Sequence, residues 1–77
     1  MLRTYVKLAF GFRLNGVHRT YAVCEDIRGC NAKPWAVFYW DEPNGAKMQL
    51  SRWYSHRGWA ERYIRKLHAE KQKHWVK

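Results

Sequence analysis

Apolar and polar residues alternate along the first part of the chain. From Val6 to Leu14 every even position is apolar, whereas the odd positions are basic or small. A period of two is typical of a half-buried β-strand. Asn15 and Gly16 follow at once, and this pair favours a two-residue hairpin loop because both residues tolerate positive φ. The pattern predicts a β-hairpin over residues 5–25.

The length of the loop decides which residues of this hairpin face each other. A two-residue loop leaves one register in which the apolar positions share a face. That register pairs Leu14 with Val17, Phe12 with Arg19, Phe10 with Tyr21 and Leu8 with Val23. We expect the opposite face to contact water, because its side chains include Lys7, Arg13, His18 and Thr20.

A second hairpin is predicted over residues 34–53. The stretch before it interrupts the alternation with charges, Gly29 and Pro34, which indicates a connection. An aromatic strand follows at 35–40, and a cluster of turn residues occupies 41–45. The simplest pairing places Phe38 opposite Met48, Ala36 opposite Leu50 and Trp40 near Ala46. The other face then carries Trp35, Val37 and Tyr39 with Lys47, Gln49 and Ser51, and a bulge in the loop would shift this register by one residue.

The last third of the chain has the spacing of an amphipathic helix, which we place at residues 55–73. Ser55 is a candidate N-cap. At about 100° per residue an apolar stripe gathers on one side, made of Ala60, Tyr63, Ile64, Leu67 and Trp75. The opposite side is a basic face made of Arg62, Arg65, Lys66 and Lys73.

These elements predict one α+β domain over residues 1–77, a small antiparallel β-sheet of three to five strands packed against one C-terminal amphipathic helix. We expect the helix to cover the sheet face that carries Phe38, Met48 and Leu50. The face with Trp35, Tyr39 and Lys47 is then left open to a ligand. The pattern leaves open whether the N-terminal hairpin joins the same sheet or packs over that second face.

The charge balance narrows the class of partner. The chain of 77 residues has 15 Lys and Arg against 6 Asp and Glu, a formal net charge of +9. Such a field attracts polyanions, chiefly nucleic acid. A hydrophobic content of 47% excludes a disordered basic tail. The basic helix face can equally be a solvated surface.

Other classes of function find little support in the sequence. No secretory signal or apolar membrane span is present, so we expect a cytoplasmic protein without a membrane partner. In that compartment we expect Cys24 and Cys30 to be reduced thiols. The spacing of the two cysteines and the scattered positions of the histidines do not suit a metal site. The acidic residues form only two adjacent pairs, Glu25 with Asp26 and Asp41 with Glu42, whose side chains point apart on an extended segment. Cys24 with His18 lacks a third group to orient it. We therefore expect neither an enzyme nor a cofactor.

Residues 22–70 resemble the plant Apetala/ethylene-response-factor type of DNA-binding domain, which phage homing endonucleases and integrases share. The residues that carry the resemblance are Arg28 and Gly29, then Lys33, Pro34 and Trp35, followed by a turn, a third strand and one helix. The resemblance implies that the sheet enters the major groove of duplex DNA. It also implies contacts to phosphate or guanine from Arg28, Lys33 and Arg52, and to phosphate from Lys47, with Trp35 against the DNA backbone.

The sequence thus favours a small nucleic-acid-binding protein, with DNA before RNA, acting as an accessory or regulatory factor of phage or mobile-element type. The predicted contacts are Arg28, Lys33, Trp35, Tyr39, Lys47 and Arg52, with the basic helix face as a secondary surface. For a single-stranded ligand Trp35 and Tyr39 would be stacking platforms. Alternatively these aromatic residues wrap the core, or the protein is a phage-type inhibitor that binds a host protein or defence complex.

Overall fold

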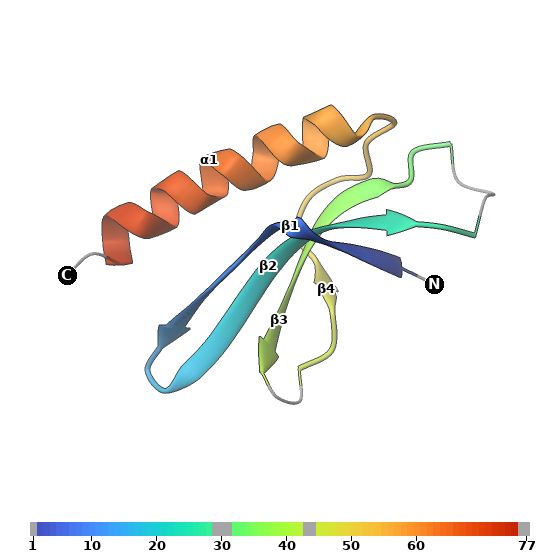
Figure 1. Cartoon of the computed structure of the whole chain (residues 1–77). Coiled ribbons are helices and arrows are strands. Elements are labelled where there is room, and N and C mark those ends of the chain that lie inside the picture. Colours follow the sequence, from blue (N-terminus) through green and yellow to red (C-terminus); the bar gives the residue numbers. More distant parts are fainter. Residues whose placement is uncertain (1, 29–31, 43–44, 76–77) are drawn as a thin grey trace.

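The computed structural model describes residues 2–28, 32–42 and 45–75 of the chain. The strands are β1 (Leu2–Leu14), β2 (Val17–Asp26), β3 (Trp35–Glu42) and β4 (Met48–Gln49). They form one antiparallel sheet in the order β1-β2-β3-β4, so the N-terminal hairpin joins the same sheet as the second hairpin. The helix α1 (Arg57–Trp75) lies across one face of this sheet (Figure 1). The predicted α+β class is confirmed.

The first hairpin turns as its sequence predicts and then departs from a regular ladder. Asn15 and Gly16 have φ values of 51° and 81°, and β1 and β2 pair from Leu14↔Val17 to Ala9↔Ala22. A bulge then separates Ala9 from Tyr5, which pairs with Val23 in place of the predicted Leu8. The bulge contains an odd number of residues, so it exchanges the two faces of β1. Leu8 still packs against the core.

The second hairpin is shifted by one residue from the simplest predicted pairing. Tyr39 pairs with Met48 and Phe38 with Gln49, so the predicted partners Phe38 and Met48 lie on opposite faces. The Gly45 amide donates to the Asp41 carbonyl over 2.6 Å, which closes a wider turn than a regular hairpin would need. A Cβ at position 45 would lie 2.5 Å from that oxygen, so the close approach requires glycine.

The helix covers the face that was predicted to be open. Tyr21, Val23 and Val37 form the buried core with Ala60 and Ile64 of α1. The pairing of β2 with β3 explains why α1 packs on this face. It places Tyr21 beside Tyr39 and Val23 beside Val37, which makes one continuous apolar surface. The expectation that the helix covers Phe38, Met48 and Leu50 is therefore wrong.

The second face of the sheet has a smaller apolar cluster of its own. Cys24, Ala36 and Phe38 are buried there, with Leu2 and Trp53 packed against them. Burial raises the pKa of the Cys24 thiol, which is free of disulfide bonding. The predicted wet face of the first hairpin is thus only partly wet, because its β2 side chains become buried toward Cys24. Cys30 lies outside the described residues.

Candidate nucleic-acid interface

A shallow hollow of about 380 Å³ lies where the segment after β4 reaches the start of α1. Figure 1 shows this segment rising beside the sheet to the first turn of the helix, at the end of the molecule opposite the β1–β2 loop. The hollow is lined by Lys33, Arg52, Trp53, Tyr54, Ser55 and Trp59. We call it the basic–aromatic hollow, because the described residues of its lining supply two cations, three aromatic rings and no carboxylate.

Backbone hydrogen bonds to β3 hold the lining in place. The amides of Trp35 and Tyr54 each donate to the other residue's carbonyl, over 3.0 and 2.6 Å. Nearer β4, the amides of Leu50 and Ser51 both donate to the Val37 carbonyl, as in a β-bulge. The second strand of the hairpin predicted over residues 34–53 is therefore a short β4 followed by an irregular edge. Arg52 and Trp53 belong to this irregular edge, and both line the hollow.

Trp59 is the most accessible aromatic ring of the hollow. Its side chain is 52% exposed, although it belongs to the first turn of α1. The guanidinium carbon of Arg62, one helical turn later, lies 5.9 Å from the centre of the Trp59 ring. Apart from the neighbouring backbone of α1, no atom of the described residues lies within 4 Å of where a Cβ of Gly58 would stand, so no other element crowds this turn. The first turn of α1 also lacks acidic residues.

Asp26, Asp41 and Glu61 each pair with an arginine. Asp26 accepts two hydrogen bonds from the Arg28 side chain, at 2.9 and 2.8 Å. Asp41 accepts two from Arg19, and this guanidinium holds the pKa of Asp41 below its usual value. On α1, the Glu61 carboxylate pairs with Arg57 and Arg65. Arg19, Arg28, Arg57 and Arg65 therefore each face a carboxylate, whereas none of the described residues that line the basic–aromatic hollow is acidic.

The predicted contact residues are divided among several places. Lys33 and Arg52 are brought together in the basic–aromatic hollow. Arg28, by contrast, is tied to the buried carboxylate of Asp26, although its side chain is 64% exposed. Lys47 lies on the second face, where its ammonium donates to the Thr4 hydroxyl over 3.0 Å and sits 5.2 Å from the centre of the Trp40 ring.

The placement of Trp35 and Tyr39 on an open face is wrong. Both pack against the core under α1, as the alternative of a core-wrapping role proposes. The Trp35 ring lies 5.2 Å from that of Tyr5, and the Arg19 guanidinium covers Tyr39 at 4.7 Å. They face the helix because their strand neighbours Val37 and Tyr21 are part of the same apolar surface. Neither ring is available as an open platform.

The predicted basic face of the helix is present in part. Arg62, Arg65 and Lys66 are exposed on α1. Arg65 is partly neutralised, since its guanidinium lies 3.7 Å from Glu61. The side chain of Lys73 lies outside the described residues. Arg62 connects this face to the basic–aromatic hollow through its contact with Trp59.

Trp59 was not among the residues predicted for the site. A signal for it exists in the sequence, because Trp59 falls to one side of the apolar stripe of Ala60, Ile64 and Leu67 on a helical projection. A tryptophan outside the stripe of a surface helix is not needed for the core. Its place beside Lys33 and Arg52 depends on the path of residues 50–56, which the pattern does not specify.

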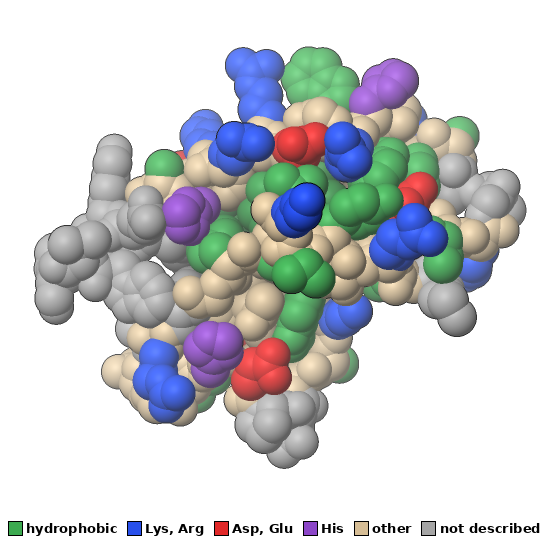
Figure 2. Space-filling model, viewed as in Figure 1, with side chains coloured by type: hydrophobic (Ala, Val, Ile, Leu, Met, Phe, Trp, Pro, Cys, Tyr) green, Lys and Arg blue, Asp and Glu red, His purple; other side chains and the backbone are tan. Residues whose placement is uncertain are grey.

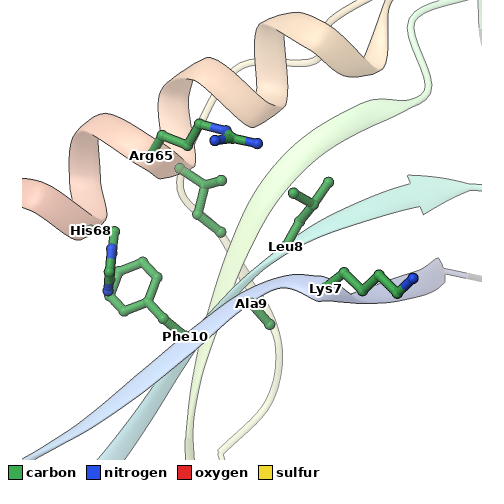
Figure 3. A pocket seen from close by; sticks show the side chains of 7 residues that line it. Lys7, Leu8, Ala9, Phe10, Arg65 and His68 are labelled. Carbon is green, nitrogen blue, oxygen red and sulfur yellow. The ribbon is translucent and has the colours of Figure 1, made fainter.

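A second hollow, of about 260 Å³, opens between α1 and the edge strand β1 (Figure 3). Leu8, Phe10 and Ile64 form its floor, and the His68 ring lies 4.7 Å from that of Phe10. Figure 2 shows hydrophobic side chains gathered at the centre of the view, with a Lys or Arg side chain among them and further charged side chains around them. Leu8, Phe10 and Ile64 also belong to the core, so this hollow is the open side of the helix–sheet packing.

Comparison with known proteins gives no relative: no protein-family model, curated protein or solved structure matches the chain. The resemblance to the Apetala/ethylene-response-factor domain therefore stays a prediction. Within residues 2–28, 32–42 and 45–75, no group of His, Cys, Asp and Glu could hold a metal ion. No helix in the same ranges is long and apolar enough to cross a membrane.

Proposed function

We propose that the protein binds nucleic acid at the basic–aromatic hollow and the adjoining basic face of α1, as a DNA-binding accessory or regulatory factor. One observation carries the proposal. Arg52 and the exposed ring of Trp59 line one hollow, and none of the described residues in its lining carries a carboxylate. DNA is named before RNA because the resemblance around Lys33, Pro34 and Trp35 implies it.

Electrostatics supports a polyanionic ligand over a neutral one. The formal net charge of +9 is spread over a chain of only 77 residues. Cations that neutralise phosphates release counterions from the nucleic acid, which drives binding without any sequence preference. Arginine also stacks and forms two-pronged hydrogen bonds with phosphate, which suits Arg52 and Arg62 to this role. Aromatic rings next to cations are typical of surfaces that bind nucleic acid.

The proposal differs from the major-groove docking of a sheet that the resemblance implies. That mode needs an open sheet face with outward side chains, whereas α1 covers the face of Trp35 and Tyr39. We therefore place the contacts with nucleic acid at the end of the sheet, on Lys33 and Arg52, and on the helix. Of the predicted contact residues, these two remain central, with Arg62 as the nearest member of the basic helix face.

Fluorescence anisotropy with labelled duplex DNA, single-stranded DNA and RNA tests this function, at low and at near-physiological salt. Arg52→Gln removes one cation from the hollow, and Arg13→Gln removes one from the exposed end of β1 as a matched control. We expect Arg52→Gln to weaken binding roughly tenfold, the effect of one charged hydrogen bond. The control should change it far less.

Two outcomes would contradict the proposal. If the wild-type protein binds none of the three nucleic acids even at low salt, the hollow serves another kind of ligand, such as a protein partner. If Arg13→Gln weakens binding as much as Arg52→Gln, the interaction is a general effect of net charge. Circular dichroism of each variant shows whether its fold is retained.

A further inference from the structure

The aromatic rings of the protein differ in how much of their surface a ligand can reach. Trp35 packs in the core, and Trp53 meets the ring of Phe38 edge-on at 5.9 Å. Trp40 is half-buried under Lys47 and donates a hydrogen bond to Glu42. Among the tryptophan side chains that the structure describes, Trp59 alone is exposed, and it lies in the wall of the basic–aromatic hollow.

An accessible indole ring can recognise only certain forms of nucleic acid. In a duplex the flat faces of the bases are stacked on one another, and a protein reaches only their edges through the grooves. In single strands and loops the bases are unstacked, so they can stack on aromatic side chains. The hollow at Trp59 therefore has no partner surface on an intact duplex, whereas an unstacked base supplies one.

We infer that the ligand of the basic–aromatic hollow is a single-stranded nucleic acid, with one unstacked base against Trp59 and its neighbouring phosphates at Lys33 and Arg52. This inference rests on the proposed function. Lys33 and Arg52 line the same hollow as the ring, so one nucleotide with its phosphates can meet all three side chains. Arg62 stands over Trp59 and adds a cation on the helix side.

The rest of the surface is consistent with this choice of ligand. The helix α1 covers one face of the sheet, so the groove of a duplex cannot reach that face. On the second face Cys24, Ala36 and Phe38 are buried. The basic–aromatic hollow combines cations with an open ring, and no described residue of its lining carries a carboxylate.

The test compares four ligands of equal length by anisotropy: a DNA strand, an RNA strand, the corresponding duplex and a DNA strand without bases. We expect the DNA or RNA strand to bind at least about tenfold more tightly than the duplex and the abasic strand. Trp59→Ala should weaken binding of the base-bearing strand about fivefold or more, while Trp59→Phe, which keeps a ring, should restore most of it.

The outcomes separate this inference from the proposed function. If the duplex binds as tightly as the strand and Arg52→Gln weakens both, nucleic-acid binding stands and the single-strand inference is overturned. The same holds if the abasic strand binds like the base-bearing one, because the ring then contributes nothing. If no ligand binds at low salt, the proposed function itself fails. The DNA and RNA arms show which sugar the hollow prefers.

Discussion

The backbone amide of Val37 donates a hydrogen bond to the side-chain oxygen of Ser51 over 2.8 Å. Because the bulge after β4 directs both the Leu50 and Ser51 amides to the Val37 carbonyl, the Ser51 hydroxyl supplies the acceptor for the Val37 amide. The same hydroxyl donates to the carbonyl of Arg52 over 2.9 Å. Ser51 thus joins the edge of the core to a residue of the basic–aromatic hollow.

Replacing Ser51 with alanine should lower the free energy of unfolding by about 1–3 kcal/mol, since it leaves a buried amide without an acceptor. Denaturation by urea measures this loss. Ser55→Ala is the matched control, because Ser55 is exposed and the structure assigns its hydroxyl no hydrogen bond within the described residues. Equal stabilities of the two variants would show that the Val37–Ser51 bond contributes nothing.

Val37 and Val6 allow one substitution to be compared in two environments. Val37 is fully buried on the face of β3 that α1 covers, whereas Val6 is 81% exposed in the bulge of β1. Val37→Ala should cost roughly 2 kcal/mol or more, because it removes buried methyl groups and leaves a cavity. In a domain of this size that corresponds to a melting temperature lower by roughly 10 °C.

Val6→Ala should change the free energy of unfolding by less than about 0.5 kcal/mol, as is usual for surface positions. Thermal melts followed by circular dichroism compare the two variants. If Val6→Ala were as damaging as Val37→Ala, the Val6 side chain would have to pack against something, and its exposed place in the bulge would be incorrect.

The Arg19–Asp41 pair predicts how stability responds to acid. The guanidinium lowers the pKa of Asp41 in the folded protein, so below neutral pH the unfolded chain binds more protons at this site. The stabilising effect of the pair is therefore complete above the ordinary pKa of an aspartate and decreases as the pH falls toward the lower folded-state value. Asp41→Asn should be modestly destabilising at neutral pH and should flatten this acid dependence.

Urea denaturation at a series of pH values checks this prediction. Arg19→Gln serves as the second variant, since it removes the other partner of the two hydrogen bonds and should flatten the same part of the curve. A wild-type slope retained in both variants would assign the acid dependence to other carboxylates, such as the buried Asp26.

Local patterns predicted the elements better than they predicted the contacts between them. Asn15 and Gly16 determine the first turn by themselves, and the apolar stripe with Ala60 and Ile64 determines which side of the helix packs. Both are short-range effects of φ preference and helical period. The side of the sheet on which α1 packs depends instead on the pairing of β2 with β3, which aligns Tyr21 and Val23 with Tyr39 and Val37.

Two irregularities account for most of the remaining differences. The bulge in β1 and the wide turn that ends at Gly45 each change the parity of a strand, and a strand shifted by one residue presents the other face. Neither has a marker in the alternation of apolar and polar residues. The candidate site differs from the predicted one for the same reason. Lys33 and Arg52 line one hollow because of the irregular edge that follows β4.

Salt dependence gives a quantitative expectation for the basic–aromatic hollow. If Lys33, Arg52 and Arg62 each neutralise one phosphate of a single strand, the logarithm of the association constant should fall with the logarithm of salt concentration with a slope of about −2. Arg52→Gln should reduce the magnitude of this slope by about 0.7, whereas Arg13→Gln should leave it nearly unchanged. Anisotropy titrations over a range of salt concentrations supply the slopes. A much steeper wild-type slope, reduced equally by both variants, would assign the phosphate contacts to the whole basic surface and not to the hollow.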